Sequence, residues 1–224
     1  MTKETDYFGR LAVQAGLAVG LVMGLVAVPV EGVWAQGPGV KQTEKLVKKA
    51  NDTVSSILAA RQQIKETLVA YNLLVGNKVE KPKKTYKDLQ KGIENTDKKV
   101  ADVDKKVAAM QKEVDILFGD WSSNLANISS EDLRNRSEER LNDTRERYNG
   151  ILSAGEEAGK VLNPFIASLK DQVVYLGHDL NPSALASLKP DADKLNKEAE
   201  VLFKKIDETV NEANRYITSL KPQS

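Results

Sequence analysis

Residues 86–128 read YKDLQKGIENTDKKVADVDKKVAAMQKEVDILFGDWSSNLANI, and this stretch decides the fold. Mostly apolar residues recur along it at spacings of three and four, with Lys, Asp and Glu between them: Tyr86, Leu89, Ile93, Thr96, Val100, Val103, Val107, Met110, Val114, Leu117, Trp121, Leu125 and Ile128. This spacing is the seam of a coiled coil. About 40 residues at 1.5 Å each make a rod about 60 Å long. Because such a seam is not stable in water, the sequence predicts that this helix packs against other helices.

Three more seams of the same kind lie on either side of this stretch. One runs from Val47 to Val75, with Arg61 at a core-type position and Gly76-Asn77 as a helix stop. The others run over residues 133–176 and 195–220. Short connections between long amphipathic helices favour antiparallel neighbours. We therefore expect an all-α fold, an elongated antiparallel four-helix coiled-coil-like bundle over residues 41–221.

The breaks between the seams carry local signals. Residues 127–130 separate the second and third helices, and Ser129 with Asp132 three residues later resembles a capping box. Pro164 follows Asn163 inside the third seam, where proline removes a backbone donor. Because the apolar pattern continues beyond it, we predict a kinked helix and not a break.

The stretch DQVVYLGHDLNPSALASL, residues 171–188, holds the only histidine. Gly177 is a candidate helix stop, and Asn181-Pro182 is typical of an N-cap followed by proline at the first helical position. A short helical piece over residues 184–189 is expected next, with Pro190 opening the last helix.

In an antiparallel arrangement, the connections between successive helices lie alternately at the two ends of the bundle. The loop over residues 78–85 shares one end with the turn at His178 and Asp179, and we predict a partner-binding tip there, with the basic residues Lys78, Lys81, Lys83, Lys84 and Lys87. Such a patch suits phosphate groups of lipid or cell-wall polymer, although many charge runs are simply solvated loops. The turn at 127–130 and both ends of the bundle domain fall at the opposite end.

Residues 1–35 have the layout of a secretory signal peptide. Lys3 and Arg10 precede an apolar run from Leu11 to Val30, and Val33-Trp34-Ala35 resembles a cleavage site. The alternative is an uncleaved anchor, because about 20 apolar residues span a bilayer. Either way residues 36 onward are exported, with 36–40 as a linker. The expected location is periplasmic or secreted, or the inner membrane if the leader is retained, and that leader is the only expected membrane contact.

Composition excludes several classes of protein. Of 224 residues 29% are charged and 5% aromatic, which favours extended helices over a large globular core. The absence of cysteine removes disulfides and thiolate ligands. A net charge of +1 does not favour any class of charged partner. Acidic residues balance the arginines of residues 134–147, so we expect no nucleic-acid binding.

Two segments invite a catalytic interpretation that the residues do not support. Residues 155–161, GEEAGKV, have three residues between the glycines, where a phosphate loop has four, and Val161 replaces its hydroxyl. The glycines are better explained by close helix approach. His178 lacks the second nitrogen ligand typical of zinc sites, so hydrogen bonding in the turn is the better interpretation. We predict no catalytic, metal or cofactor site, and structural roles for Trp121, Pro164, Gly177, Asn181 and Pro182.

A combination of residues resembles a known family. It comprises Leu117-Phe118, Trp121, Leu125, Leu133, Ser137, Leu141, Thr144, Arg147-Tyr148, Pro164 and the stretch 171–188. These residues resemble the bacterial exported family catalogued as domain of unknown function 2959, over the end of the second helix to the C-terminus. The resemblance implies an exported, helical, coiled-coil-like bacterial protein and no catalytic residues. The chain departs from it in lacking a lipobox cysteine and in carrying Gly177 and Asp179 where lysine and asparagine are expected.

These observations favour a non-enzymatic structural or interaction protein of the bacterial cell envelope, with a protein or an anionic envelope component as partner. A rival hypothesis is an envelope-stress or chaperone-like binder that exposes seam residues by opening at the Pro164 kink. A third hypothesis is homo-oligomerisation, because Arg61 and Thr96 interrupt their seams.

Overall fold

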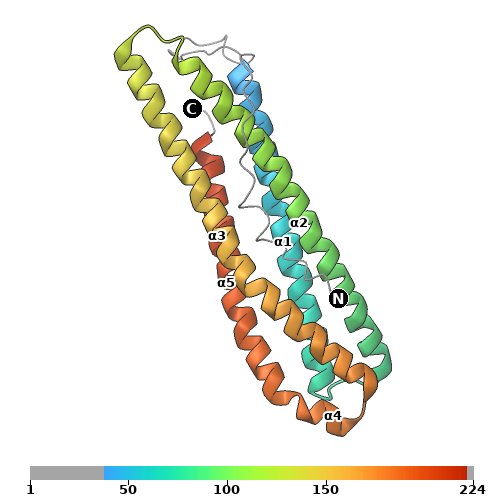
Figure 1. The fold of residues 1–224 in the computed structure, drawn as a ribbon. Helices are drawn as coiled ribbons and strands as arrows, with labels where there is room; N and C mark the ends of the chain where they lie inside the picture. The colour runs from blue at the N-terminus through green and yellow to red at the C-terminus, as the bar shows by residue number, and fades with distance from the viewer. Residues whose placement is uncertain (1–37, 221–224) are drawn as a thin grey trace, which may run out of the picture.

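A computed structural model describes residues 38–220, and every regular element in that range is a helix. The helices are α1 (Pro38–Val75), α2 (Pro82–Leu125), α3 (Glu131–His178), α4 (Pro182–Ser187) and α5 (Lys189–Leu220). The predicted all-α class is confirmed. Figure 1 shows the four long helices side by side along one axis, with the short α4 at one end.

The long helices form a bundle around one continuous core. α1 packs against α2 and α5, and α3 packs against α5 and α2. The buried cluster takes side chains from all four and runs from Leu46, near the start of α1, to Leu74 at its end. Burial of each seam against the others is the main source of stability in such an arrangement.

Helix α1 ends through local backbone chemistry. In the described residues it runs from Pro38, which falls within the expected linker, and the fixed φ of proline is compatible with a first helical turn. It stops where predicted, but Asn77, with φ of 50°, takes the left-handed position next to Gly76. The N–H of Lys78 then bonds to the carbonyl of Leu73 at 3.0 Å, as in a Schellman motif.

The other caps agree with the sequence to within a few residues. α2 ends at Leu125, before the predicted Ile128. The N-cap of α3 is Ser130 and not Ser129, because the Ser130 hydroxyl accepts from the N–H of Leu133. Asn181 caps α4 as predicted, with 2.9 Å between its Oδ1 and the N–H of Ala184. α5 begins at Lys189, one residue before Pro190.

Helix α3 continues through Pro164. Figure 1 shows α3 changing direction in its middle, in keeping with the predicted kink. The helix also runs past Gly177 to His178, so the prediction that Gly177 ends it is wrong. Gly177 has a different role, in the contact between α2 and α3.

Polar pairs between helices replace some seam contacts. Arg61 of α1 pairs with Asp207 of α5 at 3.0 Å and lies over the ring of Phe203. The hydroxyl of Thr96 on α2 lies 3.2 Å from that of Thr67 on α1. The two residues that interrupt the seams therefore have partners within the chain, and neither needs a second copy to satisfy it.

The predicted signal peptide or anchor, residues 1–35, lies outside the described residues. Along α1 to α5, no run of residues is apolar over the length that a bilayer crossing needs.

Candidate functional site

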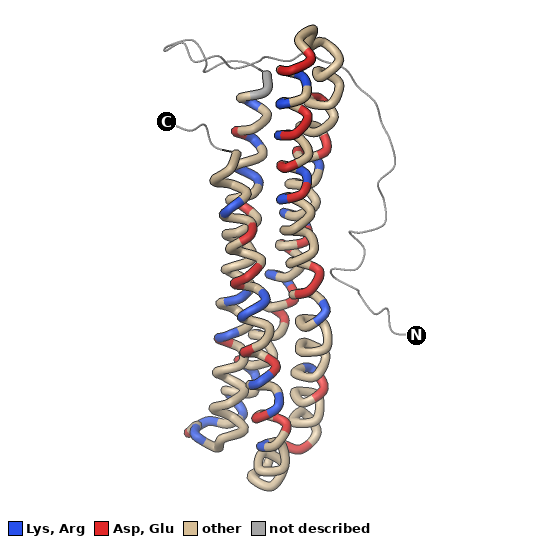
Figure 2. Tube along the Cα trace, turned by 90° about the vertical axis from the view of Figure 1, so that its left-hand side faces the viewer, with Lys and Arg blue, Asp and Glu red and all other residues tan. Residues whose placement is uncertain are grey.

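The structure brings the predicted tip residues together at one end of the bundle. The α1–α2 loop and the α3–α4 turn lie at the same end in Figure 1. The predicted partner-binding residues there are all exposed: Lys78, Lys81, Lys83, Lys84, Lys87, His178 and Asp179. Figure 2 shows basic residues at this end, whereas basic and acidic residues alternate along the first half of α3. We call this set of residues the lysine tip.

Helices α2 and α3 are tied together directly beneath the lysine tip. The hydroxyl of Tyr86 donates to the carbonyl of Val173 at 3.1 Å and accepts from Gln90 at 3.2 Å. A Cβ on Gly177 would lie 2.6 Å from the same hydroxyl. A side chain at residue 177 would therefore displace the Tyr86 hydroxyl, so the glycine inside the last turn of α3 permits this contact between the helices.

Helix α1 is bound to the same end by buried polar contacts. Tyr71, which is fully buried, hydrogen-bonds to Gln172 of α3, and burial raises the pKa of its hydroxyl. The side-chain amides of Asn72 and Asn196 bond reciprocally at 2.7 and 3.1 Å and join α1 to α5. All four long helices are thus cross-linked beneath the lysine tip, which gives the exposed loops a firm base.

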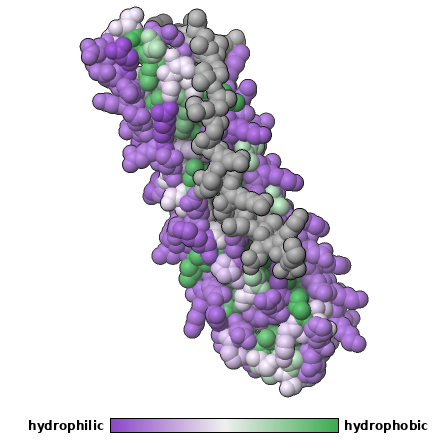
Figure 3. All heavy atoms as spheres, viewed as in Figure 1, coloured by the Kyte–Doolittle hydropathy of each residue, from purple (hydrophilic) through white to green (hydrophobic). Residues whose placement is uncertain are grey.

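Helix α4 closes the end of the core and leaves an apolar edge beside the lysines. Leu185 and Leu188 are buried under it, and the Ser187 hydroxyl lies 3.3 Å from that of Tyr175. Val174 and Tyr175 nevertheless expose 61% and 46% of their surface. Hydrophilic residues cover most of the face in Figure 3, with hydrophobic residues also showing near the α4 end. The tip combines basic charge with exposed apolar surface.

The His178 turn has the geometry of a capped helix end. Asp179 follows the last residue of α3, and its carboxylate accepts a hydrogen bond from the amide of Asn181. Within residues 38–220, no three His, Asp or Glu side chains gather as a metal site would require. The bond between Asn181 and Asp179 lies within the turn, and hydrogen bonding by His178 itself stays a prediction.

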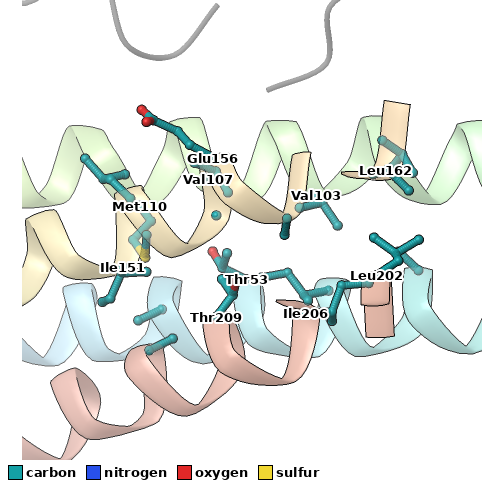
Figure 4. Close-up of a pocket in the computed structure, with 18 of the residues that line it drawn as sticks. Thr53, Val103, Val107, Met110, Ile151, Glu156, Leu162, Leu202, Ile206 and Thr209 are labelled. Atoms are coloured by element: carbon teal, nitrogen blue, oxygen red, sulfur yellow. The ribbon is translucent and has the colours of Figure 1, made fainter. Parts of the chain in front are cut away.

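A second feature lies in the middle of the bundle, where sequence analysis predicted no site. A cavity of about 120 Å³ is lined by all four long helices, through Ala50, Thr53, Ile57, Ala60 and Ile64 of α1, Val100, Val103, Val107 and Met110 of α2, Ile151, Leu152, Gly155, Glu156, Ala158 and Leu162 of α3, and Leu202, Ile206, Thr209 and Ala213 of α5. Figure 4 shows the carboxylate of Glu156 directed away from it. We call this space the interior cavity.

Small side chains leave the interior cavity unfilled. A Cβ on Gly155 would meet nothing within 4 Å, so the expectation that this glycine allows close helix approach is wrong. The GEEAGKV segment lies inside α3, and Lys160 pairs with Glu157 at 2.6 Å.

Comparison with known proteins identifies the family. The family model described as "Protein of unknown function (DUF2959)" matches residues 35–220. The chain belongs to this family. The match confirms the resemblance found in the sequence and extends it over the first helix. No curated protein and no solved structure matches the chain.

In this DUF2959 protein the interior cavity ends near an aromatic cluster. The rings of Phe118 and Tyr148 meet edge to face at 6.1 Å, and those of Tyr148 and Tyr216 lie 6.0 Å apart. Burial raises the pKa of both tyrosine hydroxyls. Trp121 lies one turn along α2 and donates to Ser137 at 2.9 Å, which agrees with its predicted structural role.

The same DUF2959 chain holds a half-buried acid on α2. Asp104 has one carboxylate oxygen buried without a hydrogen-bond partner among the described residues. Burial raises the pKa of Asp104 from 3.8 to about 6. Asp104 follows Val103, which lines the interior cavity, so this acid lies close to the cavity wall.

Proposed function

We propose that the protein is a non-enzymatic, exported structural or interaction protein of the bacterial cell envelope. In this proposal the four long helices form an antiparallel coiled-coil-like rod that presents the lysine tip to a partner. The main support is that five exposed lysines and the α3–α4 turn lie at the same end of the bundle, next to helices that are joined by hydrogen bonds.

The chemistry of the tip indicates the class of partner. Exposed ammonium groups attract anions over about 8–10 Å at physiological ionic strength. Val174 and Tyr175 add apolar surface next to this charge. An acidic protein surface or an anionic envelope polymer matches both features, and DNA or RNA is not part of the proposal.

The length of the rod adds a spatial argument. α2 has 44 residues, which at 1.5 Å per residue gives about 66 Å. If the N-terminal segment holds the opposite end in the inner membrane, the lysine tip stands about 60 Å from that membrane. If the leader is cleaved, the same rod is free in the periplasm or outside the cell.

Crosslinking in the living cell tests this proposal. A photoactivatable residue is placed at Lys83 in the tip, at Lys106 midway along α2, or at Arg136 near the opposite end. The proposal expects a defined partner from position 83 only. Partners captured mainly from position 106 would favour assembly along the helices, with sedimentation at several concentrations to detect self-association. Turnover of a substrate by the purified protein, abolished by His178→Ala, would contradict a non-enzymatic function.

The interior cavity favours a second candidate, a chaperone-like binder of unfolded protein. Separation of α2 from α3 near Pro164 would expose the apolar residues around the cavity. This hypothesis expects suppression of client aggregation, with hydrogen exchange and binding of the dye ANS increased around Pro164. A bundle that shows neither effect counts against it.

A further inference from the structure

We infer that the interior cavity is a binding site for a single-chain amphiphile, with an unbranched alkyl chain inside the bundle and a hydrogen-bonding oxygen at its head. The inference is independent of the lysine tip and of the function proposed for it.

The dimensions of the interior cavity suit a slender ligand. Its lining on α3 runs from Ile151 to Leu162, about 16 Å at 1.5 Å per residue. A volume of about 120 Å³ spread over that length is narrow. A cavity of about 150 Å³ holds benzene, which has six carbons, so a space of about 120 Å³ drawn out along α3 suits a slender alkyl chain of about six carbons.

The lining favours hydrocarbon over water. Thr53 and Thr209 line the cavity, but their hydroxyls donate to backbone carbonyls, that of Thr53 to Lys49 at 2.9 Å and that of Thr209 to Ala154 at 3.0 Å. The carboxylate of Glu156 points away from the space (Figure 4). A water molecule needs two to four polar partners to occupy a cavity stably. These contacts leave few such partners, so an alkyl chain is the better occupant.

Two tyrosines near one end of the cavity provide polar groups for a head. Tyr148 and Tyr216 lie three residues, about one turn, from the lining residues Ile151 and Ala213. Their side chains are 5% and 1% exposed. Both hydroxyl oxygens are buried without a hydrogen-bond partner among residues 38–220. A buried hydroxyl without a partner is unfavourable, and a ligand oxygen bonded to the hydroxyl of Tyr216 would remove that penalty there.

The orientation of Tyr216 agrees with this assignment. Long side chains in a helix lean toward its N-terminus. Tyr216 therefore leans toward Ala213 and the cavity. Tyr148 leans the other way along α3, and its ring lies 6.0 Å from that of Tyr216. The two rings thus belong to one aromatic cluster at the end of the apolar channel, and the Tyr216 hydroxyl is the one that leans toward the cavity.

Helices α2 and α3 both contribute to the wall of the cavity, through Val107 on α2 and through Gly155 and Glu156 on α3. Because the space beside Gly155 is open, a larger side chain there would enter the cavity. Gly150, on the same helix, is exposed and also has open space beside it, but it does not line the cavity. The chain therefore offers a matched pair of glycines for a test.

Titration calorimetry of the purified full chain with hexanoic acid, hexan-1-ol and hexane, each below its solubility limit, tests the site. We expect saturable binding of one molecule per chain. Gly155→Leu should weaken it by on the order of tenfold or more, because the new side chain occupies the channel. Gly150→Leu should bind as the wild type does. Equal binding by the two leucine variants, or no saturable binding by the wild type, would overturn the inference.

A second pair of substitutions tests the head. The wild type should bind the acid or the alcohol more tightly than the alkane, and the Tyr148→Phe/Tyr216→Phe variant should lose that preference while still binding the alkane. A preference for the acid over the alcohol identifies a carboxylate head, and the reverse identifies a neutral one. An unchanged preference in the double variant would contradict the role of the tyrosines. Circular dichroism confirms that each variant is folded.

Discussion

The hydroxyl of Tyr86 on α2 lies 2.6 Å from the position that a Cβ on Gly177 of α3 would occupy. A side chain at residue 177 and the hydroxyl of Tyr86 therefore compete for one place. The same hydroxyl donates to Val173, one turn earlier on α3. This packing holds α2 against α3 beneath the lysine tip and determines how the exposed loops are supported.

A double-mutant cycle tests this packing. In the wild type, Gly177→Ala forces the Tyr86 ring to move and should lower the free energy of unfolding by about 1–2 kcal/mol. In a Tyr86→Phe background the clashing oxygen is absent, and the same substitution should be tolerated. Urea unfolding of the four proteins gives the coupling energy, expected at about 1 kcal/mol or more. Equal effects of Gly177→Ala in both backgrounds would show that the contact is unimportant.

Asp104 gives the bundle a specific pH dependence. Its pKa rises from 3.8 to about 6 on folding, so the folded state binds the proton more tightly. The stability contributed by the protonated acid is present in full below about pH 4 and is lost as the pH rises through about 6. Asp104→Asn should stabilise the protein at pH 8 by about 1 kcal/mol after allowance for solvent screening.

Thermal unfolding of both proteins from pH 4 to pH 8 checks this prediction. The difference between Asp104→Asn and the wild type should be small at pH 4, grow as the pH rises toward about 6, and level off above it. A difference that does not change with pH would mean that Asp104 does not titrate in this range.

Two glycines should respond to alanine with opposite signs. At Gly155 a Cβ meets nothing within 4 Å, so Gly155→Ala should stabilise by up to about 1 kcal/mol through helix propensity. At Gly92 a Cβ would lie 3.0 Å from the Thr67 hydroxyl oxygen, which is bonded to Thr96. Gly92→Ala should therefore destabilise by about 1–3 kcal/mol. Denaturant unfolding measures both, and stabilisation at Gly92 would show that α1 and α2 separate easily there.

The reciprocal amide pair between Asn72 and Asn196 should behave as a unit. Asn72→Leu alone leaves the Asn196 amide without its partner and should cost about 1–3 kcal/mol. Replacing both residues by leucine removes both polar groups and should cost less than the sum of the single substitutions. Additive losses in chemical denaturation would argue that each amide finds another partner, such as water.

Sequence predicted the features that arise from local chemistry. The alternation of three and four in residues 86–128 identified the most regular seam, and the stop at Gly76-Asn77 and the cap at Asn181 were located correctly. The sequence favours Ser129 as the N-cap because Asp132 follows three residues later, but Ser130 is also suited to an N-cap, and the backbone geometry selects Ser130. Pro38 read as part of a linker because one proline is compatible with a turn and with a first helical turn.

Features that depend on distant residues could not be read from the sequence. Gly177 resembled a helix stop because its neighbour Tyr86 is 91 positions away in the chain. In the sequence Arg61 interrupts an apolar seam, and only the structure shows that it pairs with Asp207 of another helix. The interior cavity depends on how four separate seams of small and large residues meet, which no single seam specifies. The lysine tip was predictable because it needs only the order and direction of the helices.

The central claim is that the protein acts by docking its lysine tip, and charge reversal tests it most directly. The test variant is Lys81→Glu/Lys83→Glu/Lys84→Glu. The control variant, Lys41→Glu/Lys45→Glu/Lys48→Glu, lies near the opposite end of the bundle. Both variants change the net charge by the same amount, and all six positions are exposed. The measurement is the yield of partner crosslinked in cells from Tyr175, beside the tip. The account predicts a large loss in the first variant and a yield near wild type in the second. Equal yields in the two variants would contradict it.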